Sequence, residues 1–137
     1  MRNDRGAALV ETALVLPFLV LLILGMVDLG RAIVTHVEIQ DAAQEGAMFA
    51  SFRPDNHSAT IQRIQEVTDD PVIDPTQVTI VCAPGAGPGG EELVTVTVRH
   101  DLALITPIVG SWFGGTITLV GEETGTVFPA AVCDPTP

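Results

Sequence analysis

Residues 7–27 read AALVETALVLPFLVLLILGMV, a run of 21 residues that contains a single charged side chain, Glu11. As an α-helix rising about 1.5 Å per residue, this run is about 31 Å long, which matches the hydrocarbon core of a bilayer. We therefore predict a membrane-spanning helix over residues 7–27. Pro17 removes one backbone hydrogen bond inside it and is either a tolerated kink or a functional hinge.

A cleaved secretory signal peptide is the competing interpretation, because Arg2 and Arg5 precede the apolar run. Three observations disfavour it: the uninterrupted stretch is long for a signal peptide, Glu11 lies just before that stretch, and the residues from Asp28 onward lack a small-x-small cleavage site. The two arginines also predict the orientation. By the positive-inside tendency, residues 1–6 lie in the cytoplasm and everything after Val27 lies outside the cytoplasmic membrane.

With 137 residues there is room for one small domain besides the anchor.

Charged residues are distributed unevenly along the chain. After residue 27 there are 15 acidic residues against four arginines, so this part carries the whole net charge of −11, and the chain has no lysine. A field of this sign repels phosphate backbones, which disfavours nucleic acid as a partner.

The anchor is predicted to continue outward as one helix over residues 28–53, because no breaker other than Gly30 and Gly46 precedes Pro54. Within this continuation, small residues recur at intervals of four and form a flat face that permits close backbone approach. They are Ala42, Gly46 and Ala50. This face either seats the chain's own β-domain, which we favour, or packs on a helix of another subunit.

Residues 54–137 are predicted to form a small extracytoplasmic α+β domain. A short helix capped by Ser58 is expected to run to about Val67, with one apolar side formed by Ile61, Ile64 and Val67. Alternation with period two and β-branched residues then predict strands, the first two paired as an antiparallel hairpin. The strand stretches are residues 78–82, 93–98, 116–120 and 125–128, the last two either joined or separated at 121–124.

The expected fold class is therefore α+β. A long N-terminal helix, membrane-spanning in its first half and amphipathic in its second, packs against a small antiparallel sheet of three or four strands. The apolar stretch 102–113 is broken by Pro107 and Gly110 and is too short for a second span. Its Trp112 and Phe113 are expected in the core or in a subunit contact.

Cys82 and Cys133 are the only cysteines. An even pair in an exported chain predicts a disulfide, and two buried free thiols are the alternative. The bond would close a loop of about 50 residues and contribute roughly 3–4 kcal/mol by the chain-entropy argument.

No cofactor, metal site or catalytic site is predicted. The histidines at 36, 57 and 100 lack zinc-ligand spacing, and no nucleophile motif or phosphate loop is present. The acidic residues at 69, 70, 74, 91 and 92 do not match a calcium-binding loop and are better interpreted as a solvated face. An enzyme is therefore disfavoured.

The run Arg5-Gly6-Ala7-Ala8-Leu9-Val10-Glu11 resembles the processing site of type IV pilin-like proteins, in which a prepilin peptidase cuts after the glycine. Together with residues up to Pro17 and the stretches 25–31 and 42–47, it is similar to the TadE-like minor pilins (pseudopilins) of tight-adherence (Tad/Flp) pilus systems. Major Flp pilins usually follow the glutamate with tyrosine and are very short. Here Thr12 follows and more than 80 residues lie beyond the long helix, which points to a minor subunit.

This resemblance implies that the α+β fold is pilin-like. It also implies a leader peptide of residues 1–6, cleavage between Gly6 and Ala7, and a role for Glu11 in accepting a hydrogen bond from the Ala7 amine of a neighbouring subunit. The helix would then assemble into a Tad/Flp-type adhesion pilus, or help to initiate one. The implied partners are the prepilin peptidase, other pilin-like subunits, the Tad secretion machinery, and membrane lipid before assembly. The alternative is an unprocessed, single-pass membrane-anchored binding module whose acidic sheet captures a partner.

Overall fold

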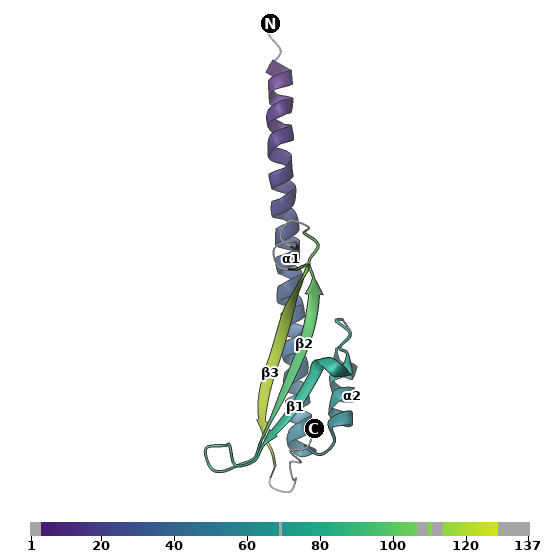
Figure 1. The fold of residues 1–137 in the computed structure, drawn as a ribbon, viewed down its shortest axis with the longest axis vertical. Coiled ribbons are helices and arrows are strands. Elements are labelled where there is room, and N and C mark those ends of the chain that lie inside the picture. The colour runs from purple at the N-terminus through teal and green to yellow at the C-terminus, as the bar shows by residue number, and fades with distance from the viewer. Residues whose placement is uncertain (1–3, 69, 107–109, 111–113, 129–137) are drawn as a thin grey trace.

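In the described part of the chain, a long helix is accompanied by a small three-stranded sheet and a short second helix (Figure 1). The computed structural model describes residues 4–68, 70–106, 110 and 114–128. The predicted α+β fold class is confirmed. Its elements are α1 (Asp4–Phe52), α2 (His57–Val67), the short 3-10 helix η1 (Pro75–Gln77), β1 (Val78–Ala83), β2 (Leu93–Ala103) and β3 (Thr116–Thr126).

Helix α1 is continuous through Pro17 and ends at Phe52, one residue before the predicted stop, where Pro54 disfavours further helix. Its first half projects away from the rest of the molecule (Figure 1). No residue between Gly6 and Val27 is buried. By length and composition, this helix is a candidate membrane span.

The sheet has the order β1-β2-β3, and both pairs are antiparallel. Val78 stands opposite Val98 in the first pair, so the predicted hairpin is confirmed. In the second pair Leu93 stands opposite Thr126. The two predicted stretches near the C-terminus are joined through Gly121 into one strand of 11 residues, which gives three strands in the described part of the chain.

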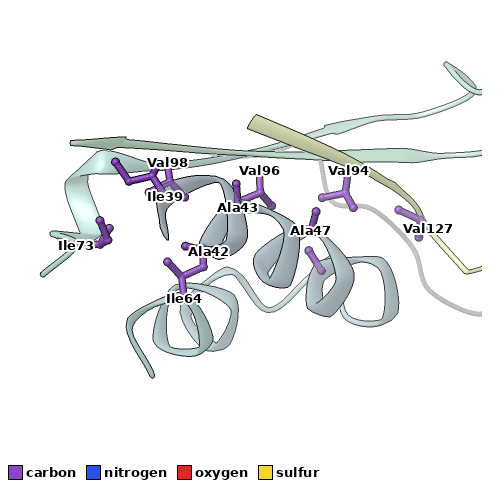
Figure 2. Packing of buried hydrophobic residues seen from close by; sticks show 11 residues of the cluster. Ile39, Ala42, Ala43, Ala47, Ile64, Ile73, Val94, Val96, Val98 and Val127 are labelled. Carbon is purple, nitrogen blue, oxygen red and sulfur yellow. The ribbon is translucent and has the colours of Figure 1, made fainter. Parts of the chain in front are cut away.

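Helix α1 lies between the sheet and α2, and the core fills both interfaces (Figure 2). Towards the sheet, Ala43 and Ala47 pack beneath the valines of β2; towards α2, Ala42 lies beside Ile64. The fully or almost fully buried core residues are Ile39, Ala42, Ala43, Ala47, Ala50, Ile64, Ile73, Val94, Val96 and Val98. The flat face that contains Ala42, Gly46 and Ala50 is thus buried inside the chain's own domain.

Three glycines set the spacing of these layers. A Cβ at Gly46 would lie 2.7 Å from Ile64 Cδ1 and 3.1 Å from Val96 Cγ1, so this position touches both neighbouring layers. On β3, a Cβ at Gly121 would lie 2.6 Å from the carbonyl oxygen of Ile39. A Cβ at Gly125 would overlap Ser51 Oγ. At Gly121 the nearest atoms belong to the backbone of α1, so a side chain there would push β3 away from the helix. At Gly46 and Gly125 the nearest atom belongs to a side chain, which would have to move.

Helix α2 differs from its prediction in two respects. Asn56, not Ser58, is the N-cap, and its Oδ1 accepts a hydrogen bond from the Ala59 N–H at 3.1 Å. Thr60 and Ile64 are fully buried, whereas Val67 is 45% exposed. The predicted stripe at intervals of three was wrong because the contact with α1 follows intervals of four along α2.

Several predictions concern residues whose structure is not described. Cys82 is half-buried in β1, but Cys133 lies outside the described residues, so the disulfide stays a prediction. Trp112 and Phe113 also lie outside them.

Candidate functional site

The predicted processing and assembly residues lie in the first turns of α1, far from the folded domain (Figure 1). Gly6 is exposed, and a Cβ placed on it would meet nothing within 4 Å. Nothing in the described part of the chain therefore requires a glycine at this position. Any requirement for glycine here comes from a contact outside the described fold.

Glu11 is exposed and has no hydrogen-bond or ion-pair partner among the described residues. The neighbouring Thr12 differs, because its hydroxyl donates to the carbonyl oxygen of Ala8 at 2.9 Å within the same helix. Ala7 lies four residues before Glu11, hence on the same helix face and about 6 Å away along the axis. The chain thus leaves a carboxylate unpaired in a segment suited to lipid, where an isolated charge is costly.

Two further glycines of α1 share the open surroundings of Gly6. A Cβ at Gly25 or at Gly30 would also meet nothing within 4 Å. A glycine inside a helix costs roughly 0.5–1 kcal/mol relative to alanine. In contrast to Gly46, these positions lower the stability of the helix without serving the packing of the described chain.

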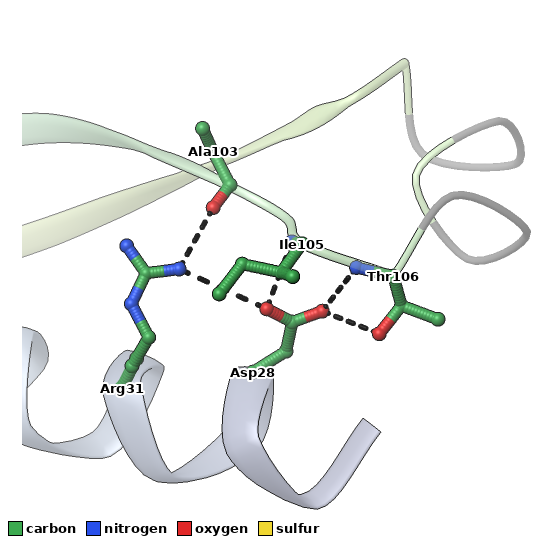
Figure 3. Close-up of polar contacts among 5 residues, drawn as sticks. All are labelled: Asp28, Arg31, Ala103, Ile105 and Thr106. Carbon is green, nitrogen blue, oxygen red and sulfur yellow. Dashed lines mark hydrogen bonds and ion pairs between the residues drawn. The ribbon is translucent and has the colours of Figure 1, made fainter. Parts of the chain in front are cut away.

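The first buried residue of α1 is Asp28, one residue beyond the predicted span (Figure 3). Its Oδ1 accepts a hydrogen bond from the Ile105 N–H at 2.9 Å, and its Oδ2 accepts from the Thr106 N–H at 2.8 Å. Oδ2 also accepts from the Thr106 hydroxyl at 2.6 Å. The carboxylate therefore holds the segment that follows β2 against the helix.

Arg31, one turn further along α1, completes this Asp28 cluster. Its Nη1 lies 3.8 Å from Asp28 Oδ1 and donates to the carbonyl oxygen of Ala103 at 3.3 Å. The hydrogen bond from the Thr106 hydroxyl is the main cause that lowers the pKa of Asp28 below its ordinary value, followed by the Ile105 N–H. The N–H of Thr106 and the charge of Arg31 add to this lowering, while desolvation opposes it.

Comparison with protein families gives one match. Residues 6–48 match the family described as TadE-like protein. This segment is TadE-like. The predicted resemblance is therefore confirmed over these residues, while comparison with curated proteins and with solved structures gives no match.

The TadE-like segment begins at Gly6 and contains Glu11, the Asp28–Arg31 turn and Gly46. Sequence reasoning assigned no role of their own to Asp28 and Arg31. No local signal could reveal the role of Asp28, because its partner Thr106 is 78 residues away in the chain. The first part of the TadE-like segment is therefore exposed in the described chain, and its last part packs against the sheet of the same chain.

The remaining candidate residues do not converge. Among the described residues, no group of three or more His, Cys, Asp or Glu side chains is arranged to hold a metal ion. His36 is exposed on α1 and His57 begins α2, whereas His100 lies half-buried on β2. Asp74 caps η1, and the Thr76 hydroxyl and N–H that donate to its carboxylate lower its pKa.

Proposed function

We propose that this chain is a minor pilin or pseudopilin of a Tad-type pilus, cut after Gly6 by a prepilin peptidase and assembled through its N-terminal helix. The observation that carries the proposal is the TadE-like match, which starts at Gly6 and includes the first half of α1, where no residue from 6 to 27 is buried. TadE-like proteins are structural proteins of the Tad pilus system, so the work assigned to this chain is assembly, not catalysis.

Before assembly the helix lies in lipid. Residues 1–6 face the cytoplasm, residues 7–27 cross the membrane, and the acidic α+β domain of residues 54–137 stands outside on the helical continuation. The exposed apolar surface of α1 supports the membrane span, and the two N-terminal arginines support this orientation. The Asp28 cluster would then fix the sheet to the helix directly at the outer face of the cytoplasmic membrane.

Cleavage gives Glu11 its role. The cut exposes a positively charged amine on Ala7, and the Glu11 carboxylate of a neighbouring subunit accepts a hydrogen bond from it. Burying two opposite charges together costs far less than burying either one alone. The lack of any partner for Glu11 among the described residues supports this assignment.

Intact-mass spectrometry of the protein from cells that express the pilus machinery tests the cut. We expect the wild-type N-terminus to be Ala7 and Gly6→Leu to block cleavage. Gly25→Leu is the matched control, because Gly25 is also a helix glycine with open surroundings, and it should be processed normally. A wild-type chain that still begins at Met1 would contradict processing and favour the membrane-anchored binding module.

Sheared filaments test the role of Glu11. Glu11→Ala should be processed and inserted like the wild type but should be depleted from filaments. Thr12→Ala is the control, because the Thr12 hydroxyl is already satisfied within its own helix. Normal incorporation of the Glu11 variant would overturn the proposed charge pair.

A further inference from the structure

A groove of about 450 Å³ lies beside α1 immediately beyond the predicted membrane span. One wall is the stretch of α1 from Val27 to Glu38, and the opposite wall is the inner face of β2 at His100 and Leu102. Asp70 and Pro71, which follow α2 in the chain, also line the groove. The proposed function leaves this groove without a role.

The groove is lined by both apolar and acidic side chains. Val27, Val34 and Leu102 supply apolar surface, while Glu38 and Asp70 supply carboxylates that form no ion pair with a described residue. Arg31 also lines the groove, but its guanidinium is engaged by Asp28 and by the Ala103 carbonyl oxygen.

His100 also lines this wall of the groove. Its Nδ1 is buried and has no hydrogen-bond partner in the described chain. A buried polar atom of this kind is costly unless it is paired.

The groove also runs along an open sheet edge. Strand β1 begins at Val78 opposite Val98, but β2 continues to Ala103. On the β1 side, residues 99–103 have no strand beside them in the described part of the chain. Such an edge presents backbone N–H and C=O groups that an extended segment can pair with.

We propose that this groove receives an extended segment of a neighbouring, basic subunit, which adds to the free edge of β2 and places a lysine or arginine side chain between Glu38, Asp70 and His100. The methylene stem of such a side chain covers apolar surface while its charged end reaches the carboxylates. The inference rests on the proposed function, for which it names a class of partner.

Charge and position select this occupant over a second copy of the chain. A second copy has no lysine and carries a net charge of −11, all of it from the part beyond residue 27, so it would bring like charge to the groove. The groove also begins at Val27, where the predicted span ends. A subunit anchored in the same membrane would present its own segment at this height.

Peptide titration of the full chain in detergent micelles, followed by NMR amide shifts, tests the inference. The probe is the acetylated and amidated pentapeptide Thr-Val-Lys-Val-Thr, and the control probe has Glu in place of Lys. We expect the Lys probe to shift the amides of Arg99, Asp101 and Ala103, and the Glu probe to bind at least about fivefold more weakly.

Two double variants separate the groove from the overall charge. E38Q/D70N should weaken Lys-probe binding at least about fivefold, as expected for the loss of two partly exposed charge contacts. D41N/D55N removes the same net charge from exposed side chains outside the groove and should leave the affinity unchanged. Equal weakening by both pairs would overturn the inference, because binding would then follow net charge alone.

Two further results would also overturn the inference. The first is that the NMR amide signals do not shift at about 10 mM Lys probe. The second is that the chain associates with itself through residues 99–103 without any probe, which would identify a second copy as the occupant. These readouts are independent of cleavage and filament incorporation. A chain that is processed and incorporated but ignores the probe refutes the groove alone. A chain that binds the probe but keeps Met1 refutes the proposed processing alone.

Discussion

Replacing single glycines by alanine distinguishes positions that pack closely against the rest of the chain from positions that have no intrachain neighbour. At Gly121 a Cβ would lie 2.6 Å from the carbonyl oxygen of Ile39 and 2.8 Å from its carbonyl carbon, which are backbone atoms of α1. At Gly30, on the same helix, a Cβ would meet nothing within 4 Å. The same chemical change should therefore have opposite effects at the two positions.

The magnitudes follow from these distances. Backbone atoms of a helix cannot rotate away, so Gly121→Ala must lift β3 from α1, and overpacking of this kind costs about 1–3 kcal/mol. Alanine regains roughly 0.5–1 kcal/mol of backbone entropy. The middle values of the two ranges leave a net destabilisation of about 1 kcal/mol, and the upper limit is about 2.5 kcal/mol. Gly30→Ala has only the favourable part, a stabilisation of about 0.5–1 kcal/mol. For a domain of this size, 1 kcal/mol shifts Tm by about 4–8 °C.

Thermal unfolding of the full chain in micelles, followed by the circular dichroism of the sheet, measures both shifts. We expect Gly121→Ala to lower Tm by about 4–8 °C, with an upper limit of about 20 °C, and Gly30→Ala to raise it by about 2–8 °C. A Gly121 variant that melts with the wild type would refute the close approach of β3 to α1. A Gly30 variant that melts well below the wild type would refute the open surroundings of that helix face.

Two further predictions concern the attachment of the sheet. Asp28→Asn should accelerate amide hydrogen exchange at Ile105 and Thr106 by about tenfold or more, because charge-assisted hydrogen bonds are lost. The pKa of Asp28 in the folded state lies below its ordinary value of 3.8. The free energy that the Asp28 carboxylate contributes to folding is therefore fully present above pH 3.8 and is lost as the pH falls through the lower, folded-state pKa. The Asn variant should lack this pH-dependent loss of stability. If Cys82 and Cys133 are bonded, reduction should destabilise the wild type by roughly 3–4 kcal/mol and leave Cys82→Ser/Cys133→Ser unaffected; an unchanged unfolding midpoint on reduction would refute the bond.

Sequence reasoning succeeded where a local pattern determines the structure. The apolar run over residues 7–27 and the absence of breakers up to Pro54 predict one long helix, and α1 ends within one residue of the expected position. Alternation with period two likewise predicts the β1–β2 hairpin. Both patterns repeat over enough residues to outweigh the weak preferences of individual side chains.

Sequence reasoning failed where contacts between distant segments determine which of several locally equivalent residues caps a helix or is buried. Asn56 and Ser58 are both good helix caps, and the sequence alone does not rank them. The buried face of α2 depends on how this helix crosses α1, which places Thr60 in the core and leaves Val67 partly exposed. The hydrogen bonds between Asp28 and Thr106 span 78 residues, so the Asp28 cluster emerges only from the fold.

The exposed surface of α1 favours assembly over a solitary anchor. Leu29, Ile33 and Val37 are 63%, 57% and 53% exposed, so an uncovered apolar stripe continues about 15 Å beyond Val27 along the helix. Shifting the span outward to cover this stripe would draw Asp28, Arg31 and the end of β2 into the hydrocarbon, where the charges and the open strand edge are unfavourable. A monomeric binding module would therefore leave the stripe in water, whereas packing against the helices of neighbouring subunits would bury it, as large exposed apolar patches usually are at interfaces.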